Sequence, residues 1–201
     1  MFRNRRFLIA ILVAGFALAP LARFGLAGGQ DQSNSGPARP AASDKKVQFN
    51  LVPAADAIAN CFPNASAKVK VLRTADEVGT DTFLLSAKGL RPNTSFAVFL
   101  TELPVSPFGS VQYLADLNTD ADGKGSVEVH AIIDEAFSSQ VVEGTRVRKE
   151  LNHVVFWFAN PGDADPCFAP GTGGTTPFDG DGVAGPAAMS SKNALPGAPL
   201  P

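Results

Sequence analysis

The sequence contains few of the residues on which most active sites depend. Its 201 residues include two histidines, two cysteines and one tryptophan. Neither the Gly-x-Ser-x-Gly pattern of a serine nucleophile nor the His-Glu-x-x-His pattern of a zinc-binding helix occurs. A catalytic histidine also needs a nucleophile and an orienting acid beside it, whereas His130 and His153 lie in or beside strand patterns. We interpret both as partly buried structural residues and assign no catalytic residue.

The first 27 residues have the three parts of a secretory signal peptide. Three arginines within the first six residues precede an apolar run over residues 7–21, and the small residues that signal peptidase recognises end at Ala27. A membrane-spanning helix needs about 20 apolar residues, but Pro20 and Arg23 cut this run short. We therefore predict cleavage after Ala27 and a secreted protein of bacterial type, outside the cell or in the cell envelope, with no membrane contact after cleavage.

Positive charge is also scarce. Removal of residues 1–27 would delete four arginines and no acid, so the net charge of −2 would become −6. The densest basic stretch contains Arg146, Arg148 and Lys149 and is flanked by Glu143 and Glu150. Binding of a nucleic acid requires clustered lysine and arginine side chains that displace counterions. The composition therefore argues against a nucleic-acid partner.

The two cysteines, Cys61 and Cys167, are far apart in a chain that carries an export signal. Disulfides form in exported proteins because that compartment is oxidising, so we predict that these two residues form a disulfide. Loop-closure arguments assign roughly 4–5 kcal/mol to a bridge that closes a loop of about 100 residues. The alternative is a pair of buried free thiols. A metal site is disfavoured because neither cysteine has a second ligand at close spacing.

Composition divides the rest of the chain into three parts. Residues 28–45 are rich in Gly, Ser, Ala, Pro, Gln and Asp, and we predict a flexible leader there. Residues 46–168 contain the periodic patterns of a folded domain. Residues 169–201 are dominated by Gly, Pro, Thr and Ala, and we predict a tail that is partly docked or mobile.

The folded part shows short strand patterns separated by Gly, Pro, Asn and Asp. Most runs alternate apolar and polar residues, which is typical of half-buried strands. Residues 154–158 are apolar on both faces, as in a central strand, so Trp157 is expected in the core rather than on an exposed sugar-binding platform. Short helices are expected at residues 54–60 and within 132–142. The strand runs are residues 47–51, 67–72, 82–85, 96–101, 111–117, 126–131 and 154–158. This pattern predicts an all-β sandwich or barrel.

Residues 90–98, Leu-Arg-Pro-Asn-Thr-Ser-Phe-Ala-Val, resemble the Leu-x-Pro-x-Thr-x-aromatic-x-Val stretch of fibronectin type III and related immunoglobulin-like domains. In that arrangement Leu90 closes one end of the core and Phe96 returns to the core on a strand. The Thr-Asp-x-x-Gly motif at residues 119–123 is similar to a hairpin of bacterial secreted sandwich domains. The resemblance implies an immunoglobulin-like β-sandwich of about seven strands, and it implies no activity, because such folds host many functions.

Two groups of polar residues are candidate calcium ligands. Asn118, Asp120, Asp122 and Gly123 match the opening of a calcium loop, but the twelfth position of that loop is Val129 instead of an acid. A hairpin turn explains the same residues and is the interpretation we favour. The second group comprises Asp163, Asp165, Asp179 and Asp181. These four could gather around Ca²⁺ if their loop folds back beside the disulfide, although a solvated acidic loop is the favoured alternative. Ca²⁺ is the sole cofactor that the sequence suggests.

These observations favour a secreted, non-enzymatic module that binds or displays something outside the cell, with an extracellular protein or a glycan as partner. The turn at residues 119–123 and the loop at residues 163–181 are the first places where a ligand is expected. Two alternatives stay open. One is a calcium-stabilised structural module, and the other is a small secreted hydrolase that brings His130 or His153 together with two carboxylates.

Overall fold

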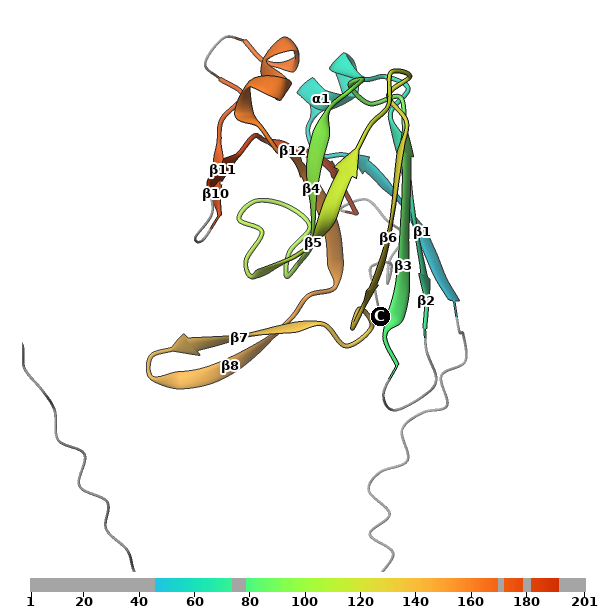
Figure 1. The fold of residues 1–201 in the computed structure, drawn as a ribbon. Helices are drawn as coiled ribbons and strands as arrows, with labels where there is room; N and C mark the ends of the chain where they lie inside the picture. The colour runs from blue at the N-terminus through green and yellow to red at the C-terminus, as the bar shows by residue number, and fades with distance from the viewer. Residues whose placement is uncertain (1–45, 74–78, 170–171, 179–181, 192–201) are drawn as a thin grey trace, which may run out of the picture. The chain divides into compact units, whose positions relative to one another are not determined.

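The computed structural model describes residues 46–73, 79–169, 172–178 and 182–191, which belong to one compact unit (Figure 1). Most of these residues are in strands, as the sequence predicts. No helix among them is long and apolar enough to cross a membrane. The elements in chain order are β1 (Lys46–Pro53), α1 (Asp56–Cys61), β2 (Ser66–Leu72), β3 (Asp81–Lys88), β4 (Ser95–Thr101), β5 (Val111–Asn118), β6 (Gly125–Ala131), β7 (Phe137–Val142), β8 (Thr145–Glu150), β9 (His153–Phe158), the 3₁₀ helix η1 (Pro161–Cys167), β10 (Thr176–Phe178), β11 (Gly182–Ala184) and β12 (Ala187–Ser190).

All seven predicted strand runs are strands, namely β1 to β6 and β9, and the helix expected at residues 54–60 is α1. The alternation has the expected cause. In β2 the side chains of Ala67, Val69 and Val71 are buried, while Lys68 between the first two is exposed and Lys70 between the last two is half-buried. Successive side chains of a strand point to opposite faces of a sheet, so this pattern gives one face to the core and the other to solvent.

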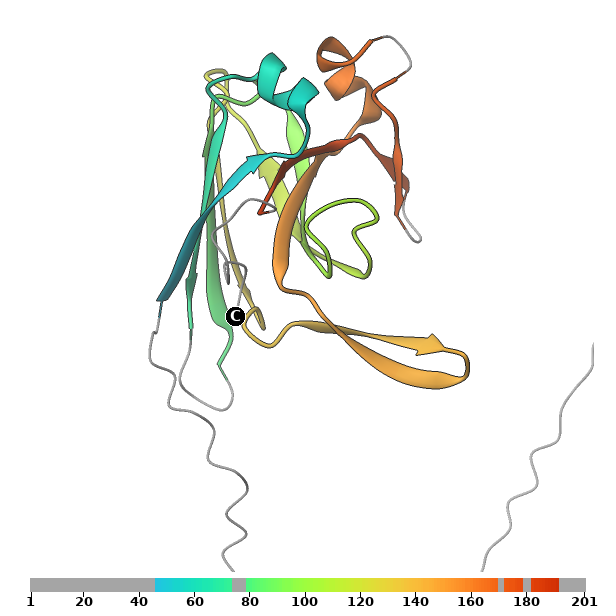
Figure 2. The same ribbon diagram turned by 180° about the vertical axis from the view of Figure 1, so that it is seen from behind.

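The helix expected within residues 132–142 is wrong, because residues 137–142 form strand β7. β7 pairs with β8 in a hairpin whose two-residue loop is Glu143 and Gly144. Both loop residues have positive φ, 50° and 81° respectively, as a tight hairpin turn of type I′ requires. The hairpin projects away from the other strands (Figures 1 and 2), so its side chains are mostly exposed and leave no clear periodic signal.

The sheet contains eight strands in the order β5-β4-β9-β12-β1-β2-β3-β6, and all neighbours are antiparallel. β1 joins its two halves, because residues 46–51 pair with β2 while Val52 and Pro53 pair with β12. The outermost strands, β5 and β6, also contact each other. The sheet is therefore bent almost into a barrel, and an immunoglobulin-like sandwich of about seven strands is not confirmed.

The core lies between the two halves of the bent sheet. The aromatic ring of Phe96 on β4 packs against those of Phe156 and Phe158 on β9, with ring centroids 5.4 Å and 4.9 Å apart. From the opposite half, Phe83 and Leu85 of β3 are fully buried. Each such side chain contributes roughly 1.5–3 kcal/mol through removal of apolar surface from water. The alternating faces of the strands therefore account for the main stabilisation of the fold.

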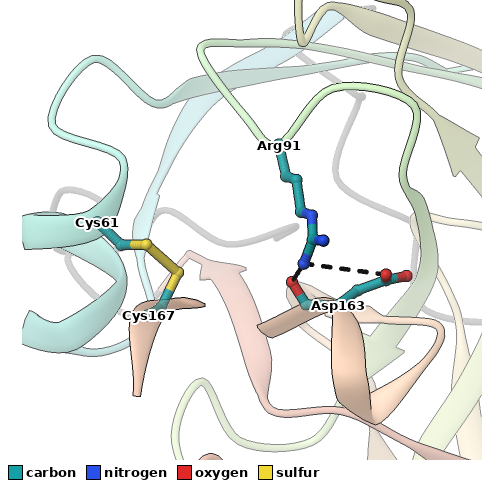
Figure 3. The surroundings of a disulfide bond; sticks show 4 residues. All are labelled: Cys61, Arg91, Asp163 and Cys167. Atoms are coloured by element: carbon teal, nitrogen blue, oxygen red, sulfur yellow. Dashed lines mark hydrogen bonds and ion pairs between the residues drawn. A yellow bond between two sulfur atoms is a disulfide. The ribbon is translucent and has the colours of Figure 1, made fainter. Parts of the chain in front are cut away.

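The predicted disulfide between Cys61 and Cys167 is confirmed (Figure 3). It joins the last residue of α1 to the last residue of η1, with 5.2 Å between the two Cα atoms. Beside it, Arg91 donates a hydrogen bond to the backbone carbonyl of Asp163, and its guanidinium lies 3.9 Å from the Asp163 carboxylate. Two cross-links thus fix η1, one to α1 and one to the loop between β3 and β4.

Candidate functional site

The two histidines are far from a catalytic arrangement. His130 is exposed on β6 and lies 3.2 Å from the carboxylate of Glu128, so the expectation of partial burial is wrong for this residue. His153 is half-buried, as expected, and its Nδ1 lies 3.2 Å from the hydroxyl of Ser191. That buried hydroxyl also accepts a hydrogen bond from the backbone N–H of Val154. Within the described residues no carboxylate contacts His153, so nothing orients its imidazole as a catalytic base.

The burial of His153 predicts a pH dependence of stability. Burial lowers the pKa of His153 below its ordinary value, whereas the unfolded chain would bind that proton near pH 6.5 (about the reference value). As the pH falls through this window, the unfolded state therefore binds more protons than the folded state, and the free energy of unfolding decreases. We expect thermal melts to show that His153→Gln loses less stability than the wild type between about pH 7 and pH 5. Equal losses in the two proteins would contradict this role.

The first acidic group forms a hairpin turn. The Asp120 carboxylate accepts hydrogen bonds from the backbone N–H groups of Asp122 and Lys124, each at 2.9 Å. The Lys124 bond is the main reason why the pKa of Asp120 lies below its ordinary value. The Asp122 carboxylate pairs with the Lys124 ammonium at 3.2 Å, and Asn118 ends β5 before the turn. The carboxylates of Asp120 and Asp122 are therefore engaged in hydrogen bonds and an ion pair within the turn.

The second acidic group is divided between different surroundings. Asp163 and Asp165 lie in η1, where Asp163 pairs with Arg91, and Asp179 and Asp181 lie outside the described residues. Over residues 46–73, 79–169, 172–178 and 182–191, no cluster of three or more His, Cys, Asp or Glu side chains is arranged to hold a metal ion. The described chain therefore offers no site of this kind.

A row of aromatic side chains crosses the outer face of β5, β4 and β9. Trp157 on β9 is fully buried, as predicted, but it faces away from the main core. Its ring packs edge-on against Phe99 of β4 at 5.4 Å, and Phe99 packs against Tyr113 of β5 at 5.5 Å. Phe108, from the loop between β4 and β5, packs against Trp157 at 4.8 Å. The apolar side chains on the two faces of β9 thus belong to two separate hydrophobic clusters.

The loop that carries Phe108 is held by several polar contacts. The backbone N–H of Leu103 donates to the carbonyl of Phe108 at 3.0 Å, and the Ser190 hydroxyl donates to the carbonyl of Pro104 at 2.6 Å. At its base, Lys149 donates to the Glu102 carboxylate at 2.9 Å. This bond, followed by one from a backbone N–H, holds the pKa of Glu102 below its ordinary value. The loop is therefore positioned by both β12 and β8.

Two neighbouring cavities lie between this loop and residues 173–176, at the start of β10. We name them together the apolar groove. The cavity toward α1 and β12 has a volume of about 280 Å³ and the cavity toward β5 about 410 Å³. Both are lined by Ser106, Phe108, Thr175 and Thr176. Further apolar walls come from Ala54, Pro104, Val105, Pro107, Phe168 and Trp157.

The lining of the apolar groove limits its chemistry. Every residue that lines the two cavities in the described structure has an uncharged side chain. The polar side chains are hydroxyls, from Ser106, Thr175 and Thr176. Such a surface can bury apolar groups and exchange a few hydrogen bonds, but it has no group to transfer a proton or to coordinate a metal ion. The groove is therefore suited to binding.

Sequence reasoning did not identify the groove, because most of its residues come from loops without periodicity. A usable signal was the run Pro104-Val105-Ser106-Pro107-Phe108, whose apolar residues lie outside every strand pattern. The comparisons provide no relative from which a site could be transferred. No protein-family model, no curated protein and no solved structure matches this chain.

Proposed function

We propose that the protein is a secreted, non-enzymatic binding module that holds an uncharged, mostly apolar part of an extracellular protein in the apolar groove. The observation that carries this proposal is the groove itself, walled by Phe108 and Trp157 and free of ionisable side chains among the described residues that line it. The bent sheet would serve as immunoglobulin-like sandwiches do, as a rigid scaffold that presents loops.

The geometry supports a chain-like ligand more than a compact one. The groove consists of two shallow cavities side by side, and neither is much larger than the lower end of the range for small-molecule pockets, about 300–1,000 Å³. Successive apolar side chains of an extended segment could occupy the two cavities, while hydroxyls of Ser106 and Thr175 bond to its backbone. Val105, which is 48% exposed, and Leu103, which is 42% exposed, extend the apolar surface at the rim.

Binding can be measured with the single tryptophan of the chain, because Trp157 forms part of the groove floor. The probe is N-phenyl-1-naphthylamine, an uncharged apolar fluorophore that accepts energy from tryptophan. We expect the wild type to bind the probe saturably, with loss of Trp157 emission. The ring introduced by Thr175→Phe would fill space in both cavities. Because binding depends on the apolar area buried there, we expect this variant to bind the probe at least about tenfold more weakly.

Tyr113→Ala is the matched control. It removes an exposed aromatic residue from the same sheet face, but Tyr113 lines neither cavity. We expect this variant to bind the probe as the wild type does. Absence of saturable binding, or equal affinity of Thr175→Phe and the wild type, would contradict the proposed function.

A further inference from the structure

The outer face of the other half of the sheet concentrates the lysines of the domain. Lys46 of β1, Lys68 and Lys70 of β2 and Lys88 of β3 project from it, and Lys124 immediately precedes β6. These are five of the six lysines among the described residues. We name this surface, made of β1, β2, β3 and β6 (Figure 1), the lysine face.

The strand register brings these side chains close together. Lys68 lies opposite Asn50 on β1 and opposite Ser86 on β3. Because β2 and β3 are antiparallel, Lys70 and Lys88 lie on opposite sides of Lys68, each two register positions away from it. Side chains two residues apart on one face are separated by about 6.5–7 Å, and neighbouring strands by about 4.8 Å. Lys68, Lys70 and Lys88 therefore form a diagonal row on one side of the sheet, with Lys68 in the middle, and we call this row the lysine cluster.

Little negative charge compensates this cluster. The four strands carry two carboxylates. Asp81, the first residue of β3, is buried and accepts hydrogen bonds from the backbone N–H groups of Ile133 and Asp134, and Glu128, the one on the outer face, contacts His130 at 3.2 Å. Within the described residues, no carboxylate pairs with Lys68, Lys70 or Lys88. The whole chain has a net charge of −2. The lysine face thus differs in sign from the rest of the protein, and a local excess of one sign attracts ligands of the opposite sign.

The lysine face is also hollowed. One depression of about 670 Å³ lies next to another of about 290 Å³, and both are lined by Lys68 and Ser86. Around them are the polar side chains of Asn50, Ser66, Lys88 and Lys124 in the first and Gln48, Lys70, Ser126 and Glu128 in the second. Lysines thus alternate with hydroxyl and amide groups along a polar trough.

The chemistry of the trough selects among anionic partners. No large apolar side chain on these four strands is exposed, so nothing is available to insert into a lipid surface. The face has no outward-directed Phe, Tyr, Trp or arginine side chain on which a nucleic-acid base could stack, and its one exposed ring, the imidazole of His130, contacts the carboxylate of Glu128. Its hydroxyls and amides match sugar hydroxyls, and its ammonium groups match carboxylates or sulfates. We propose that the lysine face binds an acidic polysaccharide, independently of the apolar groove.

The test measures binding of the secreted protein to dextran sulfate and to polygalacturonate, with uncharged dextran as the polymer control. We expect binding to both acidic polymers, no binding to dextran, and an affinity that falls as salt is raised. Binding of a DNA duplex or of phosphatidylglycerol vesicles as tightly as the acidic polysaccharides, or equal retention by dextran, would overturn the proposal.

The diagnostic variant is Lys68→Gln/Lys70→Gln/Lys88→Gln. These exposed or half-exposed side chains contribute little to folding, and thermal melts verify that the variant is folded. We expect this variant to bind the acidic polysaccharides at least about tenfold more weakly than the wild type, because it loses three exposed ion pairs of ordinary strength. We also expect the fall of log affinity with log salt concentration to become less steep, by about two to three in slope.

The matched control is Arg146→Gln/Arg148→Gln/Lys149→Gln, which removes the same charge from the β7–β8 hairpin. We expect its affinity for dextran sulfate to change by less than about twofold, because screening limits the influence of distant charges. If both triple variants lose affinity equally, net charge and not the lysine face governs binding, and the proposal is wrong. The single variant Lys68→Glu provides a second check, and unchanged affinity in it would also contradict the proposal.

Discussion

Removal of the disulfide is expected to decrease the free energy of unfolding by about 4–5 kcal/mol in the double variant Cys61→Ala/Cys167→Ala. The bridge joins residues that are 106 positions apart in sequence, so the oxidised chain has far fewer unfolded conformations than the open one. For a domain of this size the loss corresponds to a decrease of roughly 10–20 °C in the midpoint of thermal unfolding. Calorimetry and urea titration of the oxidised protein and the double variant would measure both quantities.

Reduced wild-type protein separates the loop effect from the loss of the two half-buried sulfur atoms. If closure of the loop dominates, reduced wild type and Cys61→Ala/Cys167→Ala should have similar stability. The urea dependence of the unfolding free energy should also be steeper in both than in the oxidised protein, because an open chain exposes more surface when it unfolds. A loss below about 1 kcal/mol would contradict the loop-closure argument.

The strands that the sequence predicts are those that bury one face or both. In β2 and β6 the alternation is set by the core on one side and water on the other, and in β9 the continuous apolar run reflects two buried clusters. Each of these signals is local, since it depends on the residues of the strand alone. The disulfide was predictable for a similar reason, because the chain has two cysteines and carries the pattern of an export signal.

The elements that sequence reasoning missed depend on distant partners. β12 has four residues, of which Ala188 and Met189 are fully buried, but its place in the sheet comes from pairing with β1 and β9. No period can be recognised in so short a run, and the residues with which it pairs are 30 or more positions away in sequence. Closure of the sheet almost into a barrel follows from this strand, which explains why sandwich and barrel were not distinguished.

The two candidate binding surfaces also depend on residues that are distant in sequence. Alternation in residues 67–72 predicts that Lys68 and Lys70 point outward, but their proximity to Lys88 follows from the register between β2 and β3. The apolar groove depends even more on tertiary contacts, since Phe108 reaches Trp157 from a loop almost 50 residues away. A binding surface assembled from several strands and loops is a property of the register, and a single sequence does not contain the register explicitly.

The turn between β5 and β6 leads to the second large prediction, which concerns Gly123. Its φ is +71°, a conformation that L residues adopt at a cost of roughly 1–2 kcal/mol. A Cβ atom at this position would also overlap the backbone carbonyl of Leu90, whose N–H in turn donates to the Gly123 carbonyl at 3.2 Å. We expect Gly123→Ala to destabilise the protein by about 3–4 kcal/mol, because neither backbone can move without breaking this contact.

Gly144→Ala measures the conformational part of this effect, so the difference between the two variants gives the part that comes from packing. Gly144 has a similar positive φ of 81°, but a Cβ atom there would meet nothing within 4 Å. This variant should therefore bear the conformational cost alone, about 1–2 kcal/mol, and urea unfolding should show Gly123→Ala to be less stable by a further 2 kcal/mol or so. Equal stability of the two variants would mean that the β5–β6 turn moves away from Leu90 at little cost. In that case the contact between Leu90 and Gly123 would not fix the β5–β6 turn to the loop between β3 and β4.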